Sequence, residues 1–181
     1  MRFTTKQLVL MALLTSLSII LTRIASIRIA FAGVEGIRIG LGDLPVILAG
    51  ITFGPFSGGM VGALSDVVGY FINPMGAYMP HFTLVKALSG IIPGIMMLVN
   101  SQGYKSHLYI GWIVFVTQLV TSTILTPYFL QILFGIPVGV TILPRAAALL
   151  IYTFTFPFII HTLLIRLGIM GYCRDSLSRE Q

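Results

Sequence analysis

The chain has 181 residues, of which 56% are hydrophobic and 9% charged, and its mean hydropathy is +0.99. Soluble domains carry about 25% charged residues. The composition therefore excludes a water-soluble globule. The formal net charge of +6 then has to be read by its position along the chain, because short cytoplasmic loops of membrane proteins collect Lys and Arg.

Six apolar blocks follow one another along the chain. A helix that spans a membrane needs roughly 20 mostly apolar residues, and we expect one span from each block: 8–22, 39–53, 56–72, 82–99, 108–130 and 142–165. Six such spans use about 120 residues, which leaves too little chain for a further domain of about 100 residues or more. The sequence predicts an all-α integral membrane protein with six transmembrane helices and one membrane-embedded domain over residues 1–181.

The basic residues near the predicted inner ends of the spans set the expected orientation. Six spans place both termini on the same side, and the Lys and Arg residues on that side are Arg2, Lys6, Lys105, Arg166, Arg174 and Arg179. Because positive charge gathers on the cytoplasmic side, we expect the N- and C-termini to be cytoplasmic.

The first span carries a pair of small residues, Ala12 and Ser16, one helical turn apart. Small residues at this spacing let two helices approach closely within a membrane. The pair could accept a helix of another protein or a neighbouring span of the same chain.

Three outer connections are long and rich in turn-forming residues: Ser26 to Gly36, Asn73 to Pro80 and Phe134 to Pro144. Such loops could form a lid over a cavity, which would place the ligand entrance on the outer side. Loops without any ligand role are the alternative.

The third span continues a pattern of residues at intervals of four that reads Gly50, Gly54, Gly58, Gly62, Asp66 and Tyr70. On one helix these positions form a single stripe, and the glycines are expected to pack against a neighbouring helix. An unpaired carboxylate within a span is expensive. Asp66 is therefore either a functional group or the partner of Lys86 or Arg145 in an ion pair.

Charge on the outer side is unbalanced. Five basic residues, Arg23, Arg28, Arg38, Lys86 and Arg145, face three acidic ones, Glu35, Asp43 and Asp66. The surplus of two cations indicates an anionic ligand, because charge inside or near a span needs a partner, water or a function. The alternative is that the arginines extend to the membrane surface.

Two of these cations have informative neighbours. Lys86 lies one turn from Thr83 and one turn from Gly90, so we expect it to face the bundle interior. Arg145 follows Pro144, which suits the first turn of the last span, and its guanidinium could bind a carboxylate with two hydrogen bonds. Aromatic residues that could stack on a flat ligand, or instead form interfacial belts, are Tyr70, Tyr78, His81, Trp112 and Tyr128.

Motifs of catalysis and nucleotide hydrolysis are absent from the sequence. It has no phosphate-binding G-x-x-x-x-G-K-[ST] loop and no H-E-x-x-H or G-x-S-x-G motif. We expect no catalytic residue, metal site, cofactor or nucleic-acid partner. Two alternatives stay open: an intramembrane enzyme that uses Asp66 and His81 as acid and base, and a purely structural bundle.

Several runs of residues resemble the substrate-binding S components of energy-coupling-factor (ECF) vitamin transporters. They are Ile37 to Pro45, Leu48 to Pro55, Gly62 to Asp66, His81 to Leu84 and Leu88 to Gly90. The chain looks most like the folate-specific branch, and Leu143-Pro144-Arg145 adds to that likeness.

The resemblance implies a multi-pass protein of a prokaryotic plasma membrane that captures a vitamin at its outer face. It also implies two kinds of partner besides the lipid bilayer: a transmembrane coupling protein and two cytoplasmic ATPases. The family's first helix commonly carries Ala-xxx-Ala for the coupling protein, and Ala12 with Ser16 stands at that place here.

Folate chemistry matches the residues. Asp66 could accept hydrogen bonds from the amino group and the adjacent N–H of a pterin ring, while aromatic residues stack on it. Candidates for the two tail carboxylates are Arg28, Arg38, Lys86 and Arg145. Pantothenate and biotin, with one carboxylate each, are the alternative ligands.

Overall fold

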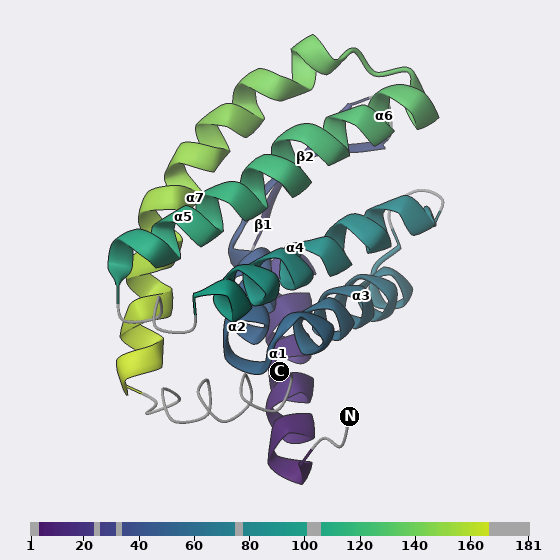
Figure 1. Ribbon diagram of the computed structural model, residues 1–181. Helices are drawn as coiled ribbons and strands as arrows, with labels where there is room; N and C mark the ends of the chain where they lie inside the picture. Colours follow the sequence, from purple (N-terminus) through teal and green to yellow (C-terminus); the bar gives the residue numbers. More distant parts are fainter. Residues whose placement is uncertain (1–3, 24–25, 32–33, 75–77, 101–105, 167–181) are drawn as a thin grey trace.

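The computed structural model describes residues 4–23, 26–31, 34–74, 78–100 and 106–166 (Figure 1). Its helices are α1 Thr5–Arg23, α2 Leu44–Phe53, α3 Pro55–Ile72, α4 Pro80–Val99, α5 His107–Gln118, α6 Thr126–Phe134 and α7 Val138–Arg166. The 3-10 turn η1, Leu41–Asp43, leads into α2, and the π-helix η3, Leu119–Leu125, joins α5 to α6 without a break. The strands β1 Ser26–Phe31 and β2 Val34–Gly40 pair as an antiparallel hairpin.

Each of the six predicted blocks contains helix in the structure, although residues 39 and 40 of the second block belong to β2. Four helical stretches are long and apolar enough to cross a membrane: Thr5–Arg23, Pro80–Val99, His107–Phe134 and Thr141–Arg166. Leu41–Phe53 is a shorter apolar helix, and α3 carries the carboxylate of Asp66 within its 18 residues. The prediction of apolar helices is thus confirmed for the part of the chain that the structure covers, and four of them have the length and composition of membrane spans.

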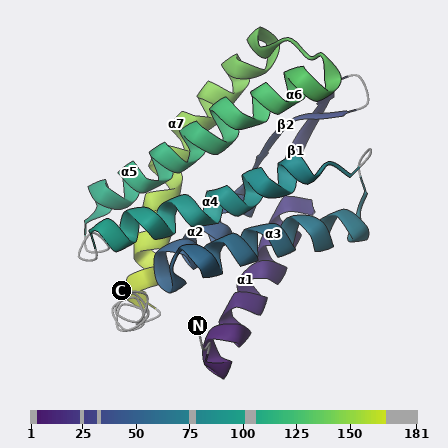
Figure 2. The ribbon, with the colours of Figure 1, turned by 45° about the vertical axis from the view of Figure 1, so that its right-hand side comes forward.

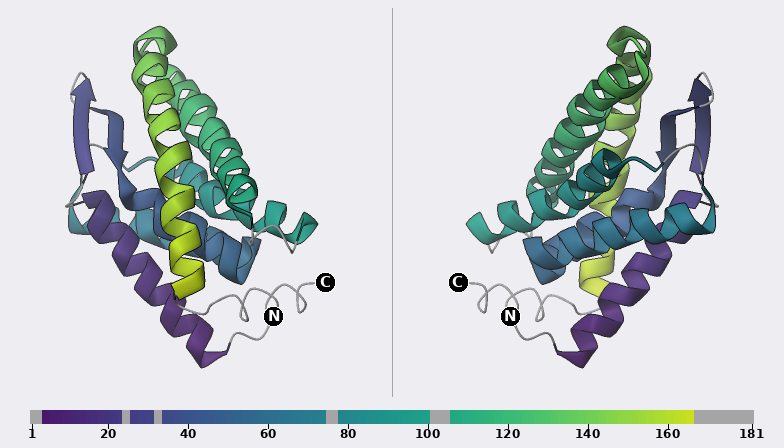
Figure 3. Two further views of the ribbon diagram at one scale, coloured as in Figure 1. Left: turned by 90° about the vertical axis from the view of Figure 1, so that its left-hand side faces the viewer. Right: turned by 90° about the vertical axis from the view of Figure 1, so that its right-hand side faces the viewer.

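The described elements begin and end at two opposite ends of the molecule. The start of α1 and the end of α7 lie at one end (Figure 3). The end of β1, the start of β2, the start of α4 and the turn between α6 and α7 lie at the other (Figure 2). Four of the basic residues used for the orientation, Arg2, Lys105, Arg174 and Arg179, are outside the described residues.

Two apolar clusters hold the bundle together. The larger one joins α2, α4, α5 and α7 through side chains such as Ile51, Met97, Ile113 and Phe156, all completely buried. The smaller one joins α1, α2 and α3 and includes Met11, Val46 and Val61. Burial of apolar groups does little to hold helices together in lipid, so close packing has to supply the stabilisation.

Glycines let α2, α3 and α4 approach to backbone contact. A Cβ at Gly50 or Gly58 would overlap the carbonyl oxygen of Gly90, and a Cβ at Gly62 would overlap that of Lys86. A Cβ at Gly94 would overlap the backbone nitrogen of Pro55. The packing role expected for the glycines is therefore the one the structure assigns to them.

The single helical stripe predicted from Gly50 to Tyr70 is wrong, because the chain turns at Gly54. Gly54 has φ 88° and ψ 175°, a conformation that is strained for residues with a side chain. Pro55 follows, and it lacks the N–H that would continue the helix and disfavours a helical residue before it. Gly50 thus belongs to α2, whereas Gly58, Gly62, Asp66 and Tyr70 belong to α3.

Two of the outer connections also differ from the prediction. Ser26 to Gly36, expected as a loop, forms β1 and the start of β2; the alternation of Ile with Arg in Ile27-Arg28-Ile29 is the period-two pattern of a strand. The connection before α7 is only Gly135–Pro137 instead of Phe134 to Pro144. Pro144 therefore lies inside α7 and not in its first turn, a placement that membrane helices tolerate.

We predict that Gly90→Ala destabilises the protein, because the new Cβ would overlap the backbone of Gly58. Overpacking of this kind costs about 1–3 kcal/mol or more, which thermal unfolding in detergent would detect as a lower Tm. The matched control is Gly111→Ala, whose Cβ would lie 3.7 Å from Cγ of Pro157, an ordinary contact. A Gly90→Ala protein as stable as the wild type would contradict the close packing of α3 on α4.

Candidate ligand-binding site

Asp66 lies in a hydrogen-bonded chain between α3 and α4. The Thr83 hydroxyl donates to Oδ2 of Asp66 over 2.7 Å, and the Tyr78 hydroxyl lies 2.8 Å from Oγ1 of Thr83. Because the single Thr83 hydrogen is used on Asp66, Tyr78 donates to Thr83. The rings of Tyr70 and Tyr78 are 5.2 Å apart. The structure therefore brings together Asp66, Tyr70 and Tyr78, three of the residues that the sequence nominated.

Lys86 faces inward, as predicted, and forms an ion pair with Asp43 rather than with Asp66. The side chains of Lys86 and Asp43 are 15% and 29% exposed. The other carboxylate oxygen of Asp43, Oδ2, accepts a hydrogen bond of 3.2 Å from Nε2 of Gln118. Three elements, η1, α4 and α5, thus meet at one polar cluster of Asp43, Lys86 and Gln118, which we call the central polar cluster.

Arg145 is the second inward-facing cation, with 8% of its surface exposed. Its Nη1 donates to the carbonyl oxygen of Ser122 over 3.0 Å. Ser122 belongs to the π-helix η3, where the backbone hydrogen bonds are more widely spaced; the backbone N–H of Thr126 donates to the Thr121 carbonyl five residues back. Arg145 therefore links α7 to the π-helix η3, which joins α5 to α6.

The hairpin places Arg28 and Arg38 opposite each other, because their Cα positions are register partners. The base of the hairpin is attached to α7, since the backbone N–H of Gly40 donates to the Tyr152 hydroxyl over 2.9 Å. The described end of the hairpin lies on the same side of the molecule as the start of α4 (Figure 2). The backbone therefore puts two candidate cations at the predicted outer end.

The remaining candidates are three aromatic residues and Arg23. His81 is exposed at the start of α4, with its ring 5.1 Å from that of Phe129 on α6. Trp112 and Tyr128 are 58% and 55% exposed and do not line the interior, which suits residues of an interfacial belt. Arg23 donates to the carbonyl oxygen of Asn73 over 2.9 Å and thereby caps the end of α3.

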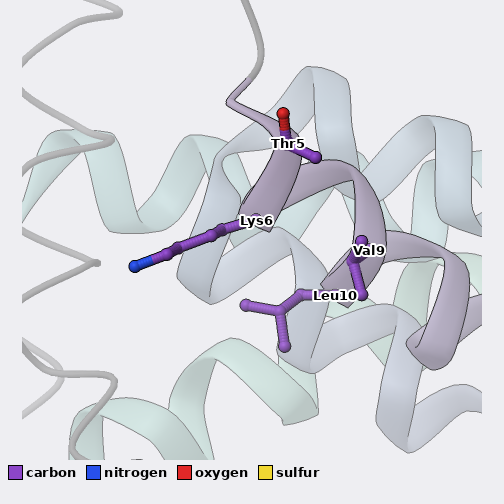
Figure 4. A pocket seen from close by; sticks show the side chains of 4 residues that line it. All are labelled: Thr5, Lys6, Val9 and Leu10. Carbon is purple, nitrogen blue, oxygen red and sulfur yellow. The ribbon is translucent and has the colours of Figure 1, made fainter.

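The first helix presents an apolar outer face with small residues in it. Ala12 and Ser16 are both exposed, and the Ser16 hydroxyl donates to the Ala12 carbonyl within the helix. Larger exposed neighbours on this helix are Leu8, Val9, Leu13, Leu17 and Ile20. At its start an open hollow of about 390 Å³ is lined by Thr5, Lys6, Val9 and Leu10 (Figure 4). This hollow lies at the end that holds the start of α1, away from the hairpin.

Sequence reasoning missed Gln118. The sequence did contain a signal for it, because Gln118 is a polar residue within an apolar span. A buried amide, like the carboxylate of Asp66, is costly unless a partner satisfies its hydrogen bonds. Asp43 was counted as a possible partner, but its choice of Lys86 depends on the close approach of α2 to α4, which the sequence pattern does not specify.

Comparisons with known proteins converge on one family. A family model described as "ECF-type riboflavin transporter, S component" matches residues 2–173. The folate transporter FolT of Clostridium novyi (strain NT) is 38% identical over 139 residues, which is 76% of either chain. A crystal structure of FolT bound with folic acid matches with a TM-score of 0.76 and 25% identity, over 91% of this chain and 97% of that one. The S component for biotin from an ECF-type ABC transporter shares the fold, with a TM-score of 0.70 and 16% identity over 90% and 94%.

We predict that Lys86 and Asp43 are energetically coupled. Lys86→Met should lower the free energy of unfolding, because it leaves the Asp43 carboxylate without its cation. The double variant Lys86→Met with Asp43→Asn should recover about 1–3 kcal/mol relative to the sum of the single effects. Thermal unfolding of the wild type, Lys86→Met, Asp43→Asn and the double variant measures the coupling. Lys6→Met, at the exposed start of α1, is the control. Strictly additive effects would show that the pair does not stabilise the fold.

Proposed function

The chain belongs to the S components of ECF-type transporters, and on that premise we propose that it captures folate at the outer face of a prokaryotic plasma membrane. The family consists of substrate-binding transport subunits, so the chain is not an enzyme. The observation that carries the folate assignment is the 38% identity to a folate transporter. The carboxylate and the surplus cations of the site support it.

Riboflavin is the second candidate, because the matching family model bears its name. The chemistry of the site favours folate over it. Riboflavin has no carboxylate, whereas the five outer cations exceed the three acidic residues by two, and the Lys86–Asp43 pair removes one charge of each sign without changing that surplus. The two carboxylates of folate balance it. Pantothenate and biotin would balance one charge each.

Within this proposal Asp66 accepts hydrogen bonds from the amino group and adjacent N–H of the pterin, and Tyr70, Tyr78 and His81 stack on the flat parts of the molecule. The contact of Tyr78 with both Tyr70 and Thr83 would hold an aromatic face beside the carboxylate. The candidate cations for the tail carboxylates are Arg28, Arg38, Lys86 and Arg145, and the hairpin position of the two arginines suits the charged tail best.

We further propose six membrane crossings with cytoplasmic termini, and assembly with a transmembrane coupling protein and two cytoplasmic ATPases. The exposed Ala12 and Ser16 would be the contact for a helix of the coupling protein. Support comes from the apolar outer face of α1, on which these small residues leave room for a close helix crossing.

Isothermal titration of the purified protein tests the ligand. We expect folate to bind with a sub-micromolar Kd and riboflavin to bind at least about 100-fold more weakly, which corresponds to about 3 kcal/mol. Weak folate binding alongside tight binding of riboflavin, biotin or pantothenate would overturn the folate assignment.

Asp66→Asn should weaken folate binding by about 10- to 100-fold, because it replaces a charged acceptor by an amide whose NH₂ group faces a ligand donor. The control is Ser65→Ala, since the buried Ser65 hydroxyl bonds only its own helix at the Gly62 carbonyl. Unchanged affinity in a folded Asp66→Asn protein would remove the ring-edge role, and loss of folding would point to a structural one.

Ala12→Leu should leave folate affinity unchanged and abolish copurification with the ATPase-containing module, because a larger side chain separates the two helices. Ala147→Leu makes the same change at an exposed position of α7 and should have no effect. Normal assembly of Ala12→Leu would place the coupling surface elsewhere.

A further inference from the structure

The amide of Gln118 is completely buried and only half of it is satisfied. The residue has 0% of its surface exposed. Its Nε2 donates to Asp43, while its Oε1 has no hydrogen-bond partner in the structure of the described residues. A buried acceptor without a donor costs about 1–3 kcal/mol. Such groups are rare in folded proteins and require an explanation.

The orientation of this amide is fixed by its neighbour. The Asp43 carboxylate, paired with Lys86, is ionised and only accepts hydrogen bonds, so the atom 3.2 Å from its Oδ2 has to be the donor Nε2. Turning the amide over would place two acceptors against each other. The carbonyl end of Gln118 therefore points away from Asp43 and keeps its acceptor capacity.

The surroundings of Gln118 also indicate a ligand. Gln118 is the last residue of α5, and η3 begins immediately after it; π-helical segments occur frequently at functional sites. Asp43, one hydrogen bond away, keeps 29% of its side chain exposed, so the central polar cluster reaches the accessible surface of the described residues. The neutral amide lies deeper than the partly exposed ion pair, where an uncharged ring is desolvated at lower cost than a carboxylate.

We propose that Gln118 is a specificity-determining residue of the ligand site, whose Oε1 accepts a hydrogen bond from the amino group of the pterin ring. The inference rests on the proposed function. It is compatible with the role given to Asp66, because an amino group has two hydrogens to donate. A flavin ring carries a carbonyl in place of this amino group, so Oε1 would face an acceptor and riboflavin would be rejected.

The test compares two ligands on four proteins by isothermal titration: folic acid and 2-desaminofolic acid, which lacks only the amino group. Gln118→Met should weaken folic acid binding by about 5- to 10-fold, the loss of one neutral hydrogen bond, and should leave the affinity for the desamino analogue unchanged. Gln118→Glu, in its protonated form, both donates to Asp43 and accepts from the ligand, so it should keep the preference for folic acid.

Thr117→Val is the matched control, because Thr117 is equally buried and its hydroxyl bonds only the Ile113 carbonyl of its own helix. Its preference for folic acid over the desamino analogue should equal that of the wild type. Thermal unfolding checks that each variant is folded. If Gln118→Met does not fold, the preference of Gln118→Glu for folic acid over the desamino analogue tests the proposal by itself.

Equal losses for both ligands in Gln118→Met would overturn the proposal and assign Gln118 to the support of Asp43. No loss for either ligand would also overturn it, and so would loss of the preference for folic acid in Gln118→Glu. If the wild type itself fails to bind folic acid, the proposed function fails, and that result is distinct from the others because it appears before any substitution is made.

Discussion

A charge within a lipid bilayer has to be paired or hydrated, and the ion pair between Lys86 and Asp43 meets this requirement at the centre of the molecule. Its two members come from α4 and from the turn before α2, and Gln118 adds α5 through the second oxygen of the same carboxylate. Replacement of a buried ion pair by well-packed apolar residues is often neutral or stabilising, so stability alone does not require a pair at this place. We propose that this pair has a function in a chain with so few charges, and the family to which the chain belongs consists of substrate-binding subunits.

The pair exists because glycines allow the helices to meet. Gly50, Gly58 and Gly90 bring α2, α3 and α4 to backbone contact, and the positive φ at Gly54 turns the chain sharply from α2 into α3. With larger residues the helices would separate by several ångströms, and a lysine on α4 could no longer reach a carboxylate before α2. These glycines thus have two consequences. They allow the close packing of α4, and they bring Lys86 within reach of Asp43.

The sequence predicts the helices well because long apolar runs in a bilayer have few alternatives to a helix. The inward direction of Lys86 and the proximity of Asp66 to Tyr70 also follow from helical periodicity. Other features depend on contacts between distant segments and could not be predicted this way. Lys86 pairs with Asp43 instead of Asp66, and Pro144 lies within a helix that begins at Val138. Arg28 and Arg38 are backbone register partners in a hairpin. Each of these choices is decided by tertiary packing rather than by local pattern.

We propose that the ligand binds among the central polar cluster, Asp66 and the outer cations. A structure of the protein with folate bound in a lipid nanodisc tests it most directly. We expect the pterin ring between Asp66 and Gln118, with the tail carboxylates directed toward the hairpin that carries Arg28 and Arg38. A ligand bound elsewhere, or a bundle centre filled by packed side chains with the arginines extended into the lipid headgroups, would contradict the account.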